Sequence, residues 1–190
     1  MPFLEVLTRC YQRPQSLARN QASLDAQTDP DWVQTLLIDE VGRGVPWANR
    51  QLGLYAPQVE GDYVWILDDD DECIRPMLVA ELKAIVEAHH PDLIMVRGDC
   101  GKHGILPPDA LWGKPPRFVH ICMSGFVVRR AVYQAYAGAW PDDVGGDFVF
   151  VSAVYAAMPV DRVYWHDEVV MQIQSKGDGR PESGKPAGQE

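Results

Sequence analysis

The sequence of 190 residues predicts an α/β domain built on a mostly parallel β-sheet flanked by helices, with a small antiparallel part near the C-terminus. Three observations predict this class. Short apolar runs alternate with longer amphipathic segments in the first half of the chain. Several short strand-like runs follow in the second half. Polar or acidic residues come directly after three of the early apolar runs, where sheets of this kind bind their ligands.

The first half of the chain reads as four strands separated by three helices. Continuous apolar runs predict strands at residues 3–8, 35–38, 63–67 and 93–96. Helices are predicted at residues 14–27, 46–55 and 76–89. Pro14 suits a first helical turn, where its missing N–H would have no partner in any case. Leu78, Leu82 and Ile85 lie on one face of the third helix, so this helix buries one side against the sheet.

The second half is less regular. Residues 98–117 are rich in Gly and Pro and predict a long loop, which in a compact domain is usually functional or disordered. Strands are predicted at residues 119–123, 126–128, 162–166 and 169–174, and a helix at residues 147–157. Residues 175–190 carry no large apolar side chain and predict a disordered tail. The expected organisation is therefore one domain over residues 1–174 and a tail over residues 175–190.

Composition limits the possible partners. The chain carries 17 Lys and Arg against 27 Asp and Glu, a net charge of −10, which argues against binding to nucleic acid or to anionic lipid. Without an apolar run of about 18 residues we expect no membrane-spanning segment. The N-terminus has no basic region typical of a signal peptide. The four cysteines contain no C-x-x-C pair and are expected to be reduced thiols. A cytoplasmic location is therefore expected.

Five consecutive acids, Asp68 to Glu72, directly follow the predicted strand at residues 63–67. Their mutual repulsion at a buried strand end predicts a cation beside them; the alternative is a solvated acidic turn. A calcium-binding EF-hand loop is excluded, because its required Gly and Glu positions hold Cys73 and Val79. A phosphatase of the haloacid dehalogenase type fits poorly, since Glu72 stands where Thr or Val is usual and the strand lies far from the N-terminus.

Residues 61–71, with Pro76 following, resemble glycosyltransferase family 2 of the GT-A fold, in which an apolar strand ends in Leu-Asp-x-Asp-Asp. Other stretches agree in order along the chain. Residues 8–14 resemble the opening loop of the family. Residues 36–39 resemble its second strand, which ends in a nucleotide-binding Asp. Residues 44–50 resemble the element of the family that contains a Gly and an Ala-Arg-Asn triplet. With residues 124–130 and 145–147, the resemblance covers about residues 3–166 and implies a Rossmann-like GT-A sheet.

This resemblance implies a metal-dependent, inverting glycosyltransferase that moves a sugar from a UDP- or GDP-sugar to a hydroxyl of a carbohydrate or another acceptor. Asp39 would contact the base or ribose, and Asp68 the ribose or sugar. Asp70 would hold Mn²⁺ or Mg²⁺, with His166 as a further metal ligand. Asp147 would be the general base. Further contacts to the nucleotide-sugar are expected from Thr8, Arg9, Tyr11, Arg13, Arg43, Asn49 and Asp69. Contacts to the acceptor are expected from Trp112, Ser124 and Gly125.

Such chemistry needs these residue types. Negative charge grows on the leaving diphosphate, and a divalent cation held by carboxylates neutralises it. A carboxylate on the opposite face of the sugar takes the proton of the acceptor, which inverts the anomeric centre. Each residue also has a simpler interpretation. Asp147 could be a first-turn acid, His166 a surface residue, Asn49 a tie from helix to loop, Trp112 a loop anchor, Arg43 solvent-exposed, and Tyr11 and Arg13 capping or packing residues.

Some positions depart from the family pattern. Arg9 replaces the usual Pro, Gln12 replaces the usual Asn, and residues 40–43 form a shorter connection than usual. Two other functions stay open. A sugar nucleotidyltransferase would carry a Gly-rich first loop, whereas residues 8–14 contain no Gly. A non-catalytic relative that binds nucleotide-sugars would keep Asp39 and Asp68 without a working base.

Overall fold

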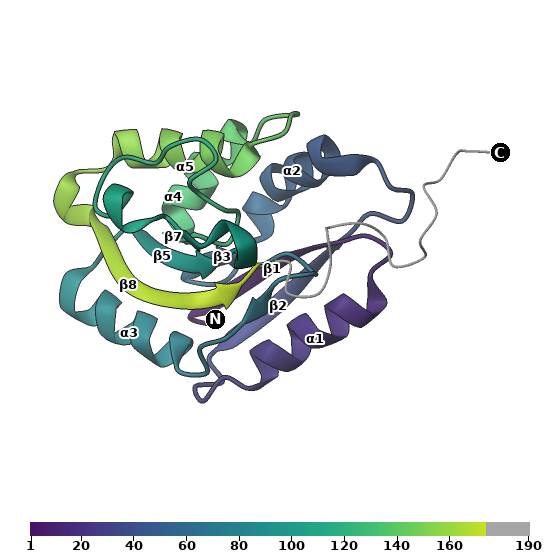
Figure 1. The fold of residues 1–190 in the computed structure, drawn as a ribbon, viewed down its shortest axis with the longest axis horizontal. Helices are drawn as coiled ribbons and strands as arrows, with labels where there is room; N and C mark the ends of the chain where they lie inside the picture. The colour runs from purple at the N-terminus through teal and green to yellow at the C-terminus, as the bar shows by residue number, and fades with distance from the viewer. Residues whose placement is uncertain (174–190) are drawn as a thin grey trace.

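The computed structural model describes residues 1–173 (Figure 1). Within them, eight strands form one sheet in the order β2-β1-β3-β7-β5-β8-β4, with β6 paired to β5. The strands are β1 (Leu4–Cys10), β2 (Trp32–Ile38), β3 (Tyr63–Ile66), β4 (Glu72–Cys73), β5 (Leu93–Asp99), β6 (Ile105–Leu106), β7 (Phe126–Arg129) and β8 (Val163–Gln172). The helices are α1 (Pro14–Asp25), α2 (Gly44–Tyr55), α3 (Leu78–His89), α4 (Arg130–Ala135) and α5 (Gly146–Ala157).

The pairing confirms the predicted α/β class with a mostly parallel sheet. Strand β1 is parallel to both β2 and β3, and β5 is parallel to β8. Strand β7 runs antiparallel between β3 and β5, while β4 and β6 are antiparallel to β8 and β5. Five of the eight described strands (β1, β2, β3, β5 and β8) therefore point the same way. Their carboxyl ends lie at one edge of the sheet, which is where an α/β sheet places its ligands.

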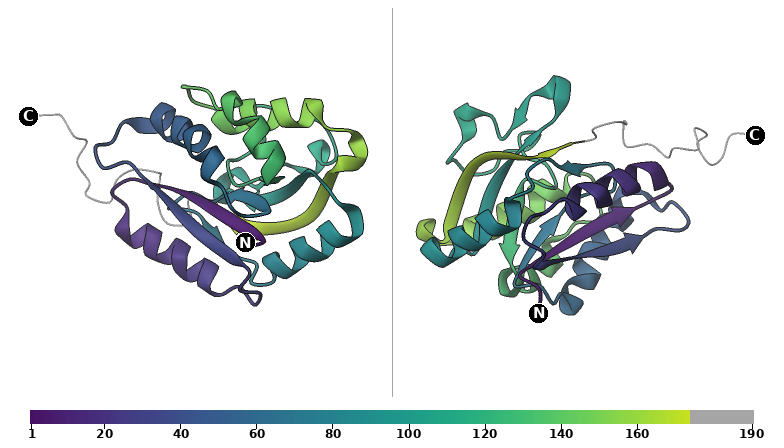
Figure 2. Two further views of the ribbon diagram at one scale, coloured as in Figure 1. Left: turned by 180° about the vertical axis from the view of Figure 1, so that it is seen from behind. Right: turned by 90° about the horizontal axis from the view of Figure 1, so that it is seen from below.

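Helices cover both faces of the sheet. Figure 2 shows α1 and α3 on one face, and α2, α4 and α5 on the other. The alternation of side chains along each strand explains the two layers, because neighbouring residues point to opposite faces. In β3, Trp65 packs in the cluster under α1 and α3, whereas Ile66 packs in the cluster under α2 and α5. The central strands β3, β5 and β7 are buried along nearly their whole length.

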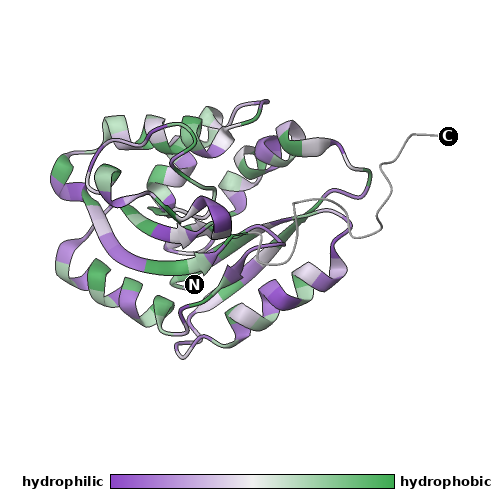
Figure 3. Ribbon diagram, in the orientation of Figure 1, coloured by the Kyte–Doolittle hydropathy of each residue, from purple (hydrophilic) through white to green (hydrophobic). Residues whose placement is uncertain are grey.

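Helix α1 buries a partly polar face. The residues that it buries are Ser16, Asn20 and Leu24, and Figure 3 shows much of this helix as hydrophilic. Asn20 is fully buried and its amide donates to the backbone oxygens of Asp68 and Asp71, at 2.9 Å each. A buried amide is tolerated when its hydrogen bonds are made. This helix therefore holds the turn that follows β3, as well as covering the sheet.

The second half of the chain departs from several predictions. Residues 119–123 were predicted as a strand and form turns instead; Val119 has a φ of 60°, and His120 donates its N–H to the carbonyl of Arg117. The predicted loop 98–117 contains the end of β5, strand β6 and two short 3₁₀ turns, Gly101–His103 and Asp109–Leu111. The two strands predicted after residue 162 are one strand, β8, with register shifts opposite Arg97.

The predicted domain end at residue 174 and the predicted tail at residues 175–190 lie outside the described residues. None of the helices within residues 1–173 combines the length and the apolar character needed to cross a membrane.

Candidate functional site

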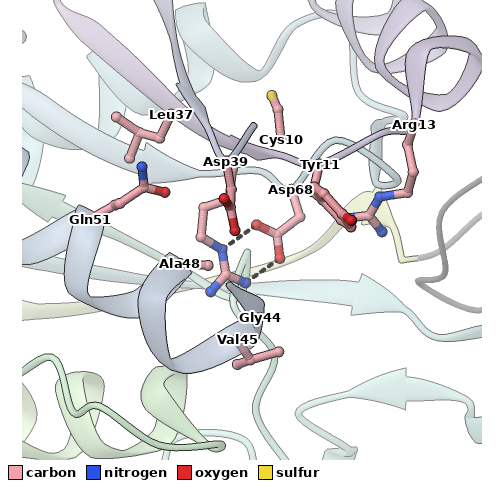
Figure 4. Close-up of a pocket in the computed structure, with 11 residues that line it drawn as sticks. Cys10, Tyr11, Arg13, Leu37, Asp39, Gly44, Val45, Ala48, Gln51 and Asp68 are labelled. Carbon is pink, nitrogen blue, oxygen red and sulfur yellow. Dashed lines mark hydrogen bonds and ion pairs between the residues drawn. The ribbon is translucent and has the colours of Figure 1, made fainter. Parts of the chain in front are cut away.

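Three neighbouring parallel strands end at the same edge of the sheet. In the register of β1 with β2, Cys10 pairs with Ile38, and in the register of β1 with β3, Leu7 pairs with Ile66. The loops after these strands therefore begin side by side. They carry residues 11–13, Asp39 and the acidic run Asp68–Glu72. Figure 4 shows Tyr11, Arg13, Asp39 and Asp68 around the cavity at this edge.

Arginines from strand β1, from the loop that follows it and from helix α1 neutralise the acidic run. Arg9 donates from Nε (2.7 Å) and Nη2 (2.5 Å) to the two carboxylate oxygens of Asp68. Arg13 bridges two carboxylates, with its Nη2 2.5 Å from Asp69 Oδ1 and its Nη1 2.5 Å from Asp70 Oδ2. Further along, Arg19 Nε lies 3.3 Å from Glu72 Oε1, and the hydroxyl of Ser124 donates to Asp71 Oδ2. The predicted need for positive charge is thus met, in large part, by guanidinium groups of the same chain.

The backbone of the run forms a tight turn that aims its side chains in different directions. The N–H of Asp71 donates to the carbonyl of Asp68 at 2.9 Å, and Asn20 bonds both of these carbonyls. The N–H of Tyr11 donates to Asp69 Oδ2 at 3.1 Å. The carboxylates of the run are consequently shared among Arg9, Arg13 and Arg19, with Arg13 between Asp69 and Asp70, and this reduces the repulsion expected from five adjacent acids.

Burial leaves the site short of positive charge. The guanidinium groups of Arg9, Arg13 and Arg19 lie against the five carboxylates of the run. Burial raises the pKa of Asp69 to about 6, although Arg13 opposes that rise. Burial also raises the pKa of Asp70. The edge of the sheet is therefore an electrostatically unsatisfied site that favours a cation.

Arg9 joins the acidic run to helices α2 and α5. Its Nη1 donates to Asn49 Oδ1 at 2.6 Å, and Asn49 Nδ2 donates to the carbonyl of Asp143 at 2.7 Å. Asn49 is therefore a tie between helix and loop, as its simpler interpretation held, and it also orients Arg9. A Cβ at Gly146 would lie 2.4 Å from Asn49 Nδ2, so α5 can approach this closely only because a glycine stands there.

Asp147 lies in the first turn of α5, beside this network. Its Oδ1 accepts the N–H of Phe148 at 2.8 Å. Burial raises its pKa, and the positive charge of Arg9 opposes that rise while Asp68 adds to it. Asp147 thus shares one electrostatic environment with Arg9 and Asp68, and its carboxyl takes up a proton more readily than an ordinary aspartate does.

Asp39 organises the short connection between β2 and α2. Its carboxylate accepts the N–H groups of Val41 and Gly42 at 3.1 Å each, and that of Arg43 at 2.5 Å. Gly42 has a φ of 75°, and a Cβ there would lie 2.3 Å from the hydroxyl oxygen of Tyr11. The turn and the aromatic ring therefore pack closely, and both line or border the cavity.

The cavity brings together part of the predicted site. Arg9, Tyr11, Arg13, Asp39 and Asp68 line it, as predicted contacts to a nucleotide-sugar would. The sequence did not single out the remaining lining residues, which are Cys10, Leu37, Gly44, Val45, Ala48 and Gln51. Helical spacing could have found those on α2, since residues 44, 48 and 51 share one face of a helix. Leu37 lies two residues before Asp39, and alternation along a strand puts both on one face.

Two predicted nucleotide contacts lie elsewhere. Thr8 is fully buried and its hydroxyl accepts a hydrogen bond from Gln34 at 2.8 Å, on the face that α1 covers. Arg43 stacks on the ring of Trp47, 4.4 Å from its centroid. Neither side chain lines the cavity. Thr8 follows the alternation of β1, because Arg9 and Thr8 must point to opposite faces of the sheet.

The predicted acceptor contacts are also spread. Trp112 packs between the guanidinium of Arg97 (4.2 Å to the ring centroid) and the edge of Trp165 (4.8 Å), which is the loop-anchoring role. The hydroxyl of Ser124 contacts Asp71. The carbonyl of Gly125 accepts the N–H of Val96, which lies in β5. Ser124 is therefore the predicted acceptor residue that touches the acidic run.

The predicted metal ligands are not brought together. His166 Nε2 lies 3.3 Å from Glu81 Oε2 on α3, so His166 belongs to a cluster with Glu81 and not to the acidic run. Within residues 1–173, no three His, Cys, Asp or Glu side chains form a metal-binding group. The carboxylates present still suit a Mg²⁺ or Mn²⁺ site in which the protein supplies few of the ligands. These cations need only one or two protein carboxylates when water and phosphate complete their shell, and Asp69 and Asp70 offer that.

Comparisons with known proteins identify the fold. No known protein-family model and no curated protein sequence matches the chain. Among solved structures, residues 1–349 of S. aureus TarS match with a TM-score of 0.70 and 15% identity, over 90% of this chain and 60% of that chain. TarS is also known in complex with UDP and with UDP-GlcNAc. The mannosyltransferase PcManGT from Pyrobaculum calidifontis, in complex with GDP-Man and Mn²⁺, matches with a TM-score of 0.65 and 17% identity, over 94% of this chain and 58% of that chain.

A third structure, A197 from STIV, matches with a TM-score of 0.59 and 16% identity, over 88% of this chain and 82% of that chain. The chain thus spans 58% to 63% of the TarS and PcManGT structures above. At these identities the likeness establishes the fold. The chain therefore has a GT-A-like fold, as the resemblance in its sequence implies.

Proposed function

We propose that this protein is a metal-dependent, inverting glycosyltransferase that moves a sugar from a UDP- or GDP-sugar to a hydroxyl of a carbohydrate or other acceptor. The observation that carries the proposal is the cavity at the carboxyl ends of β1, β2 and β3, where Asp39, Asp68 and two arginines meet. Proteins with the same fold bind UDP-GlcNAc and GDP-Man. The proposed activity therefore uses the site that such a sheet offers to ligands.

The donor would lie along the cavity from the apolar lining to the acidic run. Leu37, Val45 and Ala48 offer an apolar surface to a base, and Asp39 stands beside them to accept a hydrogen bond from the base or ribose. Arg9 and Arg13 line the same cavity and carry the positive charge that a diphosphate needs. Asp70 would hold Mn²⁺ or Mg²⁺, and the bound cation would act as Lewis acid toward the leaving diphosphate.

Asp147 is the proposed base. Its raised pKa brings it nearer to neutrality than an ordinary aspartate, and a base is most effective when its pKa lies near the working pH. The charges of Arg9 and Asp68 act on Asp147, and both of these residues line the cavity, which supports a place for Asp147 near the donor sugar. A carboxylate that removes the proton of the acceptor while the diphosphate leaves from the other face gives one displacement, with inversion.

The cellular setting is part of the proposal. The four cysteines are free thiols, which supports a reducing compartment such as the cytoplasm.

Release of nucleoside diphosphate tests this function. We expect purified protein with Mn²⁺ to release UDP or GDP slowly from at least one nucleotide-sugar in a panel, and to stop when the metal is chelated. Release of pyrophosphate from a nucleoside triphosphate and a sugar phosphate would favour a nucleotidyltransferase instead. Binding without turnover toward any acceptor would indicate a non-catalytic relative. A product with retained anomeric configuration would contradict the role of Asp147.

A further inference from the structure

We propose that Arg13 is an internal counter-cation that occupies the metal-facing oxygens of Asp69 and Asp70, and that a nucleoside diphosphate draws it away so that a divalent cation can bind. The inference rests on the proposed function and deepens it. It makes the binding of the nucleotide and the binding of the metal mutually dependent. The metal alone then binds weakly, and each ligand strengthens the binding of the other.

The first step is the geometry of Arg13. One guanidinium bridges Asp69 Oδ1 and Asp70 Oδ2 at 2.5 Å each. Both oxygens are buried, and within the described residues neither has a hydrogen-bond partner apart from these ion pairs. A metal that binds Asp70 through this oxygen must therefore replace Arg13.

The second step is the contrast between the two arginines of the site. Arg9 makes two contacts with Asp68 and a third with Asn49, which fixes it between the strand and helix α2. The ion pairs of Arg13 are with carboxylates alone, and Arg13 stands at the end of the loop, immediately before Pro14. Its long side chain can turn toward the cavity while α1 stays in place. Arg13 is therefore the residue of the pair that can exchange partners.

The third step is the energetic consequence. Displacing Arg13 by a metal alone would leave a buried guanidinium without a partner, which is costly. A diphosphate removes that cost, because phosphate oxygens match the planar fork of a guanidinium. Arg13 and Asp39 line the same cavity, so a nucleotide held there presents its phosphates within the reach of Arg13. Binding of the nucleotide thus frees Asp69 and Asp70 for the cation.

Coupling between two ligands is reciprocal and can be measured without turnover. We would titrate Mn²⁺ into the full-length protein, with the free ion followed by electron paramagnetic resonance, in the absence and presence of saturating UDP or GDP. In the wild type we expect nucleoside diphosphate to tighten Mn²⁺ binding by about 5- to 150-fold, the usual range of such coupling. In Arg13→Gln we expect Mn²⁺ alone to bind more tightly than in the wild type, and the coupling to fall toward one.

A matched control is available on helix α1, which begins directly after Arg13. Arg19 pairs with Glu72, one residue beyond the turn, so Arg19→Gln removes a similar charge without touching Asp69 or Asp70. This variant should keep the coupling of the wild type. If Arg13→Gln does not fold, as judged by circular dichroism, Arg13→Lys replaces it. Lysine keeps the charge but lacks the planar fork that holds a diphosphate through two parallel hydrogen bonds, so the coupling should shrink.

Two results would overturn the inference, and they differ from failure of the function. If both nucleotides bind and the Arg13 variant retains the full coupling, or binds Mn²⁺ alone more weakly than the wild type, Arg13 is not the counter-cation. If neither UDP nor GDP binds to the wild type with or without Mn²⁺, the proposed function itself fails and the inference fails with it.

Discussion

Burial sets the acid–base character of the single carboxylates at this sheet edge. Asp69, Asp70 and Asp147 all have raised pKa values, and burial is the largest cause in each. Of these, Asp147 is separated from the acidic run and lies at the start of α5. The same burial that makes the charged form costly also makes Asp147 a better base near neutral pH. Function and stability therefore oppose each other at this residue.

Asp147→Asn tests that opposition. We expect the turnover rate to fall by about 10²- to 10⁴-fold, with binding of UDP or GDP unchanged. In the wild type the rate should rise with pH through a pKa above the ordinary value of 3.8, because the base must be ionised. The asparagine variant should be at least as stable as the wild type at pH 7, since a buried charge is removed. Turnover at the wild-type rate would contradict the assignment.

Asp70→Asn tests the proposed metal contact. We expect Mn²⁺ binding in the presence of saturating UDP or GDP to weaken by about tenfold or more, because a carboxylate ligand is replaced by a neutral amide. Isothermal titration calorimetry measures this without turnover. Glu72→Gln is the control, since Glu72 pairs with Arg19 at the far end of the acidic run. Equal Mn²⁺ affinity in the Asp70 variant and the wild type would remove Asp70 from the metal site.

At the scale of elements, close approach between α2 and α5 holds the site together. Asn49 of α2 contacts both Arg9 and the loop that leads into α5. Gly146 permits this approach because it lacks a side chain. The arrangement means that a change at the start of α5 is transmitted through Asn49 to Arg9, and from Arg9 to Asp68.

Gly146→Ala should disturb this contact. The added methyl would lie 2.4 Å from Asn49 Nδ2, so one of the two must move. We expect the free energy of unfolding to fall by about 1–3 kcal/mol, as in other overpacked sites, and nucleotide binding to weaken as well. Gly138→Ala is a suitable control, because nothing lies within 4 Å of a Cβ at that position. Chemical denaturation measures the stability and calorimetry the nucleotide binding. If both are the same in Gly146→Ala and in the wild type, the contact between α2 and α5 does not hold the site.

An ion-pair cluster ties the starts of β5 and β8 at the opposite edge. Arg162 donates to both carboxylate oxygens of Asp92 at 2.9 Å, and Arg129 lies 3.3 Å from the same group. Hydrogen bonds from Arg162 are the largest cause of the lowered pKa of Asp92. Asp92→Asn should cost about 1 kcal/mol of stability at pH 7.

This loss has a defined pH dependence. A carboxylate with a lowered pKa contributes stability above its unfolded pKa of about 3.9, and the contribution disappears as pH falls through the folded pKa. The difference between wild type and Asp92→Asn should therefore close in acid. Denaturant unfolding at pH 7 and below pH 4 checks it, and a difference that stays constant with pH would show that the ion pairs contribute nothing.

Elements with strong periodicity could be predicted from sequence, whereas short ones could not. The apolar runs of β1 and β3 and the helical stripe of α3 each carry their own signal. Strand β4 has two residues and α4 has six, so neither offers a full period to detect. The turn at residues 119–123 was mistaken for a strand because apolar composition does not reveal that Val119 adopts a left-handed backbone.

The site was predictable only in part, for a related reason. The acids could be found because they are adjacent in sequence and follow a strand. Their partners Arg9, Arg13 and Arg19 are about 50 to 60 residues away along the chain, and only the register of β1 against β3 brings them opposite. The placement of His166 against Glu81 likewise depends on how β8 crosses α3. Contacts of this kind are decided by tertiary structure.

At the scale of the whole molecule, the charge of −10 is partly concentrated at one edge of the sheet. Ligands that bring positive charge to this edge, or that bind together with a cation, should stabilise the folded state. A ligand at 100 times its Kd adds about 2.7 kcal/mol. For a chain of this size we expect Mn²⁺ and nucleoside diphosphate together to raise Tm by about 5–10 °C, and each alone by much less. If Mn²⁺ alone or nucleoside diphosphate alone raised Tm as much as the two together, the proposed coupling would be contradicted.

A crystal structure of the protein with Mn²⁺ and UDP or GDP tests the central claim most directly. The account predicts the base against Leu37 and Val45, the ribose near Asp39, and the diphosphate beside Arg13 with the metal on Asp70. A nucleotide bound away from the edge formed by β1, β2 and β3, or a diphosphate remote from Asp68–Asp70, would contradict it.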